Sequence, residues 1–180
     1  MKKTILSLAL VLAAGFVFAQ KKTTTSASVS FDATTAIDKL PKADNKTAIA
    51  SLDTKTGKLA FEVTIKNFSF SNPRIQEHFN GEGWMNSDKF PTATFKGDIT
   101  NLKEINFSKD GTYLVVVNGE ISIHGVTRPM EANGSVVVKG SKISTTSEFK
   151  IKLEDFEVNG GAIAAGKVSK EPVITVAAEF

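Results

Sequence analysis

The chain has 180 residues, with 22 Lys and Arg against 19 Asp and Glu, a net charge of +3 and no cysteine. This length suits one domain of ordinary size, and the near balance of charge gives no reason to expect nucleic acid as a partner. The lack of cysteine excludes thiol catalysis, Cys-based metal sites and disulfides, so a hydrophobic core must supply the stability.

The first 19 residues have the pattern of a secretory signal peptide. Lys2 and Lys3 precede an apolar run from Ile5 to Phe18, and Ala19 ends a segment suited to cleavage. The apolar run is shorter than the ~20 residues of a membrane-spanning helix. We therefore expect cleavage near Ala19, a periplasmic or secreted protein, and a single mature domain over residues 20–180. Without the two lysines, 20 basic and 19 acidic residues remain, so the mature net charge falls to +1.

Alternating apolar residues predict strands along most of the mature chain. The clearest segment is KLAFEVTI (58–65), in which every second residue from Leu59 to Ile65 is large and apolar. We expect eight strands, near residues 26–31, 46–53, 58–65, 92–99, 112–123, 129–139, 143–153 and 173–180. Short stretches with Gly between them, such as KDGT (109–112), are typical of hairpin turns.

One stretch departs from this pattern. The apolar phase shifts after Ile65, which predicts a bulge or bend near Asn67. The segment that follows, from Asn72 to Gly81, has a capping residue, then Pro73, and a glycine at its end. We therefore expect a short helix over residues 73–80.

Together these elements predict an all-β fold, an eight-stranded antiparallel up-and-down barrel with one short helix. Closure of the sheet removes unpaired edges. A barrel of about eight strands encloses either packed side chains or one small ligand. The alternation shows which face of each strand is apolar, and both interpretations remain open at this point.

Catalytic and metal sites are poorly supported by the sequence. Ser122 precedes His124 by two residues, but no oxyanion motif or nucleophile elbow accompanies them. Glu154 and Asp155 are adjacent, so a paired-carboxylate mechanism has little support. His78 and His124 are the only histidines, whereas a zinc site needs three or four converging ligands. We expect no enzyme activity, no metal and no cofactor.

The chain ends in Phe180 after an alternating strand, as many outer-membrane barrels do. Such barrels carry aromatic girdles at both membrane interfaces. One Tyr and one Trp cannot form two girdles, so we expect a protein that does not span the membrane.

The segments MNSDKFPTATFKGDI (85–99), GEISIHGVTRPM (119–130) and LEDFEV (153–158) resemble motifs of the YceI-like family. MNSDKFPTATFKGDI (85–99) is similar to its S-x-x-F/Y-P-x-x-x-F segment, and GEISIHGVTRPM (119–130) to its G-x-L-T-I-H-G-V-T strand and corner. LEDFEV (153–158) is similar to its D-F-G segment, with Glu157 in place of the glycine. The family's opening strand often carries a histidine and a tryptophan, which are absent before residue 78 here, so the chain looks like a variant branch.

The resemblance implies a lipocalin-like barrel, periplasmic or secreted, that binds polyisoprenoid or related amphiphilic lipids in its interior. On this basis we expect an apolar cavity lined by Phe61, Val63, Ile65, Val117, Ile121, Phe149 and Ile151. The polar headgroup would lie at a barrel mouth. Trp84, His124 and Arg128 are the mouth candidates, with Trp84 and the short helix at the mouth opposite His124.

The mouth residues also have simpler interpretations. His124 could tie down the corner through backbone contacts, with Gly125 allowing the turn. Arg128 could hold an anionic headgroup or pair with a surface acid. The function we expect is lipid carriage or sequestration without catalysis. The alternative is the same barrel with a packed core, acting as an envelope stress or interaction module.

Overall fold

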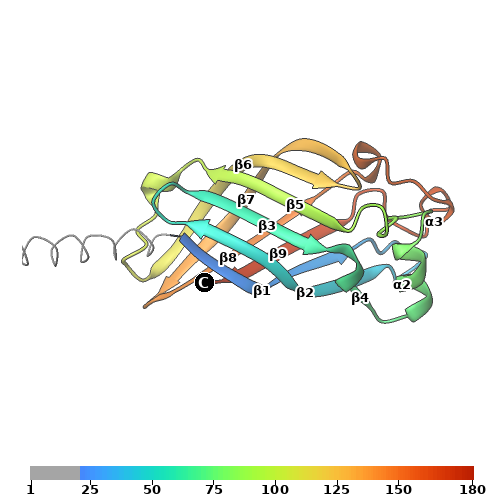
Figure 1. Ribbon diagram of the computed structural model, residues 1–180, viewed down its shortest axis with the longest axis horizontal. Coiled ribbons are helices and arrows are strands. Elements are labelled where there is room, and N and C mark those ends of the chain that lie inside the picture. The colour runs from blue at the N-terminus through green and yellow to red at the C-terminus, as the bar shows by residue number, and fades with distance from the viewer. Residues whose placement is uncertain (1–20) are drawn as a thin grey trace, which may run out of the picture.

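The computed structural model describes residues 21–180 (Figure 1), so the expected signal peptide lies outside the described residues. Eight long strands form the body of the molecule. They are β1 (Lys21–Asp32), β2 (Lys42–Asp53), β3 (Lys58–Thr64), β5 (Thr92–Ile99), β6 (Gly111–Ile123), β7 (Val126–Lys139), β8 (Lys142–Lys150) and β9 (Val173–Glu179). Each expected strand is present.

The long strands close into an up-and-down barrel. Each pairs antiparallel with the next long strand along the chain, from β1–β2 through β8–β9. The last strand, β9, pairs with β1 from Ser28–Ala177 to Asp32–Val173 and so completes the ring. The predicted fold class is confirmed.

The change of apolar phase after β3 has a local cause. A single 3-10 turn, η1 (Ile65–Asn67), follows β3 and carries the chain into the two-residue strand β4 (Ser69–Phe70), which pairs with β2. The buried Asn45 of β2 supports this bend, because its side-chain amide donates to the carbonyl of Thr64 at 2.9 Å. The predicted bend is confirmed, whereas β4 is too short to have been expected.

The predicted helix is also confirmed as α2 (Pro73–Asn80). The Asn72 side chain accepts the backbone N–H of Arg74 at 2.9 Å, and Pro73 occupies the first turn. The N–H of Gly81 returns to the carbonyl of Glu77 and ends the helix. Only Phe79 of this helix is fully buried, so α2 contributes one aromatic side chain to the core.

The segment after β8 differs from the expectation of a strand to residue 153. Regular strand ends at Lys150, and the 3-10 turn η3 (Leu153–Phe156) follows. Leu153 N–H still reaches the carbonyl of Lys170 at 3.0 Å, but Glu157 at φ 57° then reverses the chain. The remaining short elements are η2 (Leu102–Glu104) and α3 (Gly161–Ala164).

The interior contains two apolar clusters, one toward each end of the barrel. The end that carries α2 and α3 (Figure 1) is filled by an aromatic cluster around Phe79. The cluster consists of five aromatic residues, Phe31, Phe68, Phe70, Phe79 and Trp84, and each ring centroid lies within 6.1 Å of another in the cluster. These five residues are called the aromatic plug. The opposite end holds the far cluster of Leu52, Ile99, Ile105, Val115, Val117, Val136, Val138 and Ile143.

Candidate functional site

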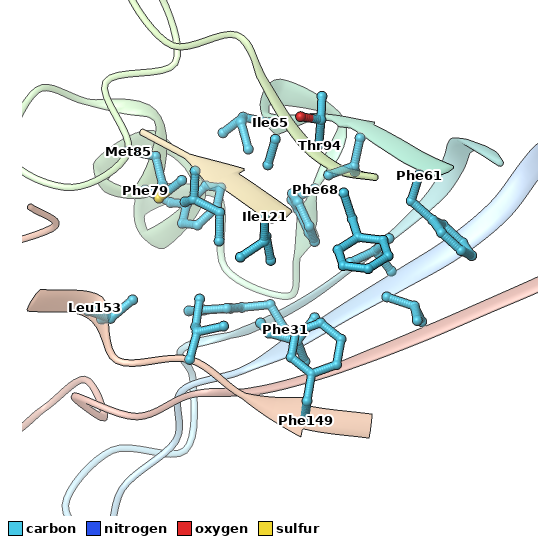
Figure 2. A pocket seen from close by; sticks show the side chains of 18 residues that line it. Phe31, Phe61, Ile65, Phe68, Phe79, Met85, Thr94, Ile121, Phe149 and Leu153 are labelled. Carbon is cyan, nitrogen blue, oxygen red and sulfur yellow. The ribbon is translucent and has the colours of Figure 1, made fainter. Parts of the chain in front are cut away.

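An apolar cavity of about 100 Å³ lies inside the barrel (Figure 2). Six strands surround it, namely β1, β3, β5, β6, β8 and β9. The wall is completed by side chains from η1 and the residue after it, from α2 and the segment after it, and from the chain after β8. The lining residues are Val29, Phe31, Phe61, Val63, Ile65, Phe68, Phe79, Met85, Ala93, Thr94, Phe95, Ile121, Ile123, Phe149, Ile151, Leu153, Ile174 and Val176.

The lining is almost wholly hydrocarbon. Thr94 is the one lining residue with a side-chain oxygen, and its cross-strand partners Glu62 and Ser122 belong to the outer face of the sheet. Hydrogen bonding inside the cavity is therefore not available to a ligand from these side chains. Because burying an unpaired polar group costs free energy, such a cavity favours a hydrocarbon chain and disfavours a headgroup.

Six of the seven residues expected to line a cavity do so. They are Phe61, Val63, Ile65, Ile121, Phe149 and Ile151. The seventh, Val117, faces the interior but lies in the far cluster and is 6% exposed. Alternation assigned it to the correct face of β6, but it gives no information on depth along the barrel axis.

Most of the lining was not assigned from sequence. Five of these residues lie on strands that were predicted, but the side of each strand that faces the interior was not. They are Val29 and Phe31 of β1, Phe95 of β5, and Ile174 and Val176 of β9. Their signal was the same alternation that identified β3. Phe79 and Met85 come from the helix and the irregular segment after it, where no strand pattern could place them.

Side chains around the cavity differ in how tightly they are packed. Phe61, Phe95 and Phe149 are only partly buried, although all three line the cavity. Phe79, by contrast, is 2% exposed and contacts Phe70 at a centroid distance of 4.9 Å. The cavity is thus closed by the aromatic plug at the α2 end and bordered by less constrained phenyl groups in the middle.

Trp84 is placed in the aromatic plug rather than at an exposed mouth. Its side chain is 7% exposed, and its ring lies 5.3 Å from that of Phe79. The indole Nε1 has no hydrogen-bond partner among the described residues. Trp84 also lies at the same end of the barrel as His124, because α2 and the β6–β7 corner are both at that end (Figure 1). The expectation of opposite mouths is wrong.

His124 forms the corner between β6 and β7. It adopts φ 53° and Gly125 adopts φ 79°, as a two-residue hairpin turn requires. Its Nδ1 lies 3.2 Å from the carbonyl oxygen of Phe156, and its ring lies 4.4 Å from that of Phe90. These contacts attach the corner to η3 and to the segment before β5, which is the geometry of a structural residue.

Ser122 and His124 do not form a catalytic pair. The Ser122 hydroxyl is 2.6 Å from the hydroxyl of Thr127 across the hairpin, whereas His124 contacts Phe156. Glu154 and Asp155 are exposed and belong to the 3-10 turn η3.

Arg128 lies on β7, opposite Ile121 of β6, and is exposed. Its guanidinium has one long contact, 3.4 Å to the carbonyl of Thr127. The salt bridges found within residues 21–180 join other residues, so Arg128 has no acidic partner there. An exposed guanidinium without a carboxylate partner is available to an anionic group.

In the described part of the chain, no group of three or more His, Asp or Glu side chains is placed to hold a metal ion. Within residues 21–180, no helix is both long and apolar enough to cross a membrane.

Several proteins of known structure share this fold. A polyisoprenoid-binding domain from Saccharophagus degradans superposes with a TM-score of 0.74 at 12% identity, covering 89% of this chain and 97% of that one. BcnA of Burkholderia cenocepacia gives 0.70 at 18% identity, covering 86% and 96%. A YceI protein of Campylobacter jejuni gives 0.56 at 20% identity, covering 74% and 79%.

At these identities the structural likenesses establish the fold. No curated protein is similar enough to be matched. The family itself is shown by sequence, since the YceI-like domain matches residues 15–180, and the chain therefore belongs to the YceI-like family.

Proposed function

We propose that the protein is exported and binds an amphiphilic, isoprenoid-like lipid, with the hydrocarbon tail inside the barrel and the headgroup outside. It would act as a carrier or a sequestering protein and carry out no chemistry. The observation that supports this most directly is the hydrocarbon lining of the cavity, contributed by six of the eight long strands. Its structural relative from Saccharophagus degradans, described as polyisoprenoid-binding, adds support at the level of the fold.

The size of the cavity limits how the tail can be held. About 100 Å³ of free space is smaller than the ~150 Å³ engineered cavity that accepts benzene. A longer isoprenoid tail therefore needs side chains to move apart. The partly buried phenyl groups of Phe61, Phe95 and Phe149 are suited to this, because they have fewer contacts to lose than the ring of Phe79.

The small volume also favours a second candidate. If the phenyl groups do not move, the interior is a packed core, and the barrel acts as an envelope stress or interaction module. The two candidates differ in one measurable property, which is binding of a branched hydrocarbon tail to the isolated protein.

Titration with geranylgeraniol and geranylgeranyl diphosphate tests the proposal, since both carry the same tail. The matched variants are Ala93→Leu, which fills the cavity, and Ala164→Leu, which enlarges an exposed residue of α3. We expect Ala93→Leu to weaken both ligands and Ala164→Leu to weaken neither. Absence of binding to the unmodified protein would support the packed-core alternative.

Export requires a separate test, because it concerns residues outside the described structure. We propose that mature protein begins at Gln20. N-terminal sequencing of protein from the cell envelope should find Gln20, whereas intact Met1 in a soluble cytoplasmic fraction would contradict export.

A further inference from the structure

One part of the barrel wall lacks strand pairing. The pairing of β7 with β8 runs from Lys139–Lys142 to Gly134–Ser147 and goes no further. Beyond that point β7 continues as residues 126–132, paired only with β6, while the chain after Ser147 continues along β9. These facing segments, residues 126–132 and 149–152, are called the seam.

The seam is held at its two ends by side-chain hydrogen bonds. The Ser147 hydroxyl donates to the carbonyl of Asn133 at 2.7 Å where the pairing stops. At the other end, His124 Nδ1 lies 3.2 Å from the carbonyl of Phe156. Separation of the seam between these points therefore requires side chains to move but leaves the β7–β8 ladder intact.

The cavity borders one side of the seam directly and comes within one strand of the other. Phe149 and Ile151 line it from the chain that borders the seam, and Ile121 and Ile123 line it from β6, the strand next to β7. In the described structure both barrel ends are more tightly filled. Leu52 and Val136 of the far cluster are at most 1% exposed, and the aromatic plug closes the α2 end.

Arg128 gives an independent indication that the wall is thin here. Residues directly opposite on paired strands project from the same face. Arg128 is opposite Ile121, which lines the cavity, so Arg128 leaves β7 on the interior face of the sheet and is nevertheless exposed. An interior-facing side chain this close to the strand end reaches solvent either at the barrel mouth or through an incomplete wall, and the unpaired seam beside Arg128 provides the second path.

We infer that the hydrocarbon tail enters the cavity sideways through the seam, and that the headgroup stays at the seam beside Arg128 rather than at a barrel end. This rests on the proposed function and specifies the route and headgroup position for the same cavity. Met130, a partly buried residue that projects inward from the middle of the β7 side, is the flexible side chain that must move aside.

The absence of cysteine makes this testable by single-site labelling. Met130→Cys treated with methyl methanethiosulfonate restores a side chain close in length and shape to methionine. The same variant treated with a bulky maleimide obstructs the seam. Gly83→Cys labels the α2 end, where an added Cβ meets nothing within 4 Å, and Ser108→Cys labels the exposed loop at the opposite end.

The measured quantity is the association rate of all-trans-retinol, an isoprenoid-derived probe whose fluorescence rises in an apolar site. We expect the bulky label at position 130 to slow association at least about tenfold, equivalent to a barrier increase of about 1.4 kcal/mol. The methylthio form and the bulky labels at positions 83 and 108 should leave the rate unchanged.

The outcomes separate the seam from the proposed function. Slower association with a label at position 83 or 108, and not at 130, would place the entrance at a barrel end. Failure of the unmodified protein to bind retinol and geranylgeraniol would instead overturn lipid binding itself.

A second variant tests the seam without a label. Ser147→Ala removes the hydrogen bond at the end of the seam. We expect association and dissociation of retinol to accelerate by a similar factor, which leaves the equilibrium affinity unchanged. Unchanged rates in this variant, together with unchanged rates in the labelled Met130→Cys protein, would refute the lateral route.

Discussion

Truncation of phenylalanine at selected positions distinguishes an adaptable cavity from a packed core. Phe61 and Phe149 are partly buried and border the existing cavity. Phe156 is the matched control, because it is 3% exposed, belongs to the core and does not line the cavity. Its contact with His124 uses the backbone carbonyl, so Phe156→Ala keeps that partner.

The expected magnitudes follow from burial. A phenyl group removed from a packed core costs about 3–5 kcal/mol, which combines lost transfer free energy with the new cavity. Full burial of a Phe side chain contributes about 1.5–3 kcal/mol by transfer alone. Phe61 and Phe149 are incompletely buried beside space that already exists, so we expect a loss of about 1–2 kcal/mol for each.

Chemical denaturation of the ligand-free variants provides the assay. We expect Phe156→Ala to lose about 3–5 kcal/mol and the two cavity variants to lose clearly less, with no change in the denaturant dependence. Losses of the same size at all three positions would show that the middle of the barrel is as tightly packed as the core around η3, and would refute the cavity argument.

Three further predictions concern charged and polar groups near the site. Arg128→Ala should weaken geranylgeranyl diphosphate by about 1–3 kcal/mol and leave geranylgeraniol nearly unchanged in calorimetric titration; equal losses would place the headgroup elsewhere. His124→Ala should lower the melting temperature more than it lowers affinity, because its contacts join the corner to η3. The backbone N–H of Thr34 lowers the pKa of Asp32 below 3.8, so this carboxylate stabilises the fold above that pH and the contribution is lost as the pH falls further. The stability difference between wild type and Asp32→Ala should therefore be largest near neutral pH and shrink in acid, and a constant difference would contradict this assignment.

The sequence predicted the barrel well because each long strand repeats one physical pattern. In KLAFEVTI every second side chain is apolar, and β3 occupies Lys58–Thr64 of that segment. The helix could be predicted equally well, since Asn72, Pro73 and Gly81 mark its two ends without any knowledge of tertiary contacts. The start of β1 at Lys21 was missed, because its first residues are polar and are held by pairing with β2.

Properties that depend on several strands at once were not available from the sequence. Val117 has the correct phase but lies in the far cluster, because its depth is set by the register of β6 against its neighbours. The burial of Trp84 depends on contacts with Phe31 and Phe79, which are far from one another in the chain. The seam likewise appears only when the end of β7–β8 pairing is known.

The central claim is that the barrel interior holds the tail of an amphiphilic lipid, and native mass spectrometry of protein purified from the cell envelope tests it most directly. Wild type and Ala164→Leu should carry a noncovalent adduct that solvent extraction identifies as a hydrocarbon-tailed amphiphile, and Ala93→Leu should carry less of it. The account would be contradicted if the wild-type protein is detected without an adduct and also binds neither geranylgeraniol nor geranylgeranyl diphosphate when they are added.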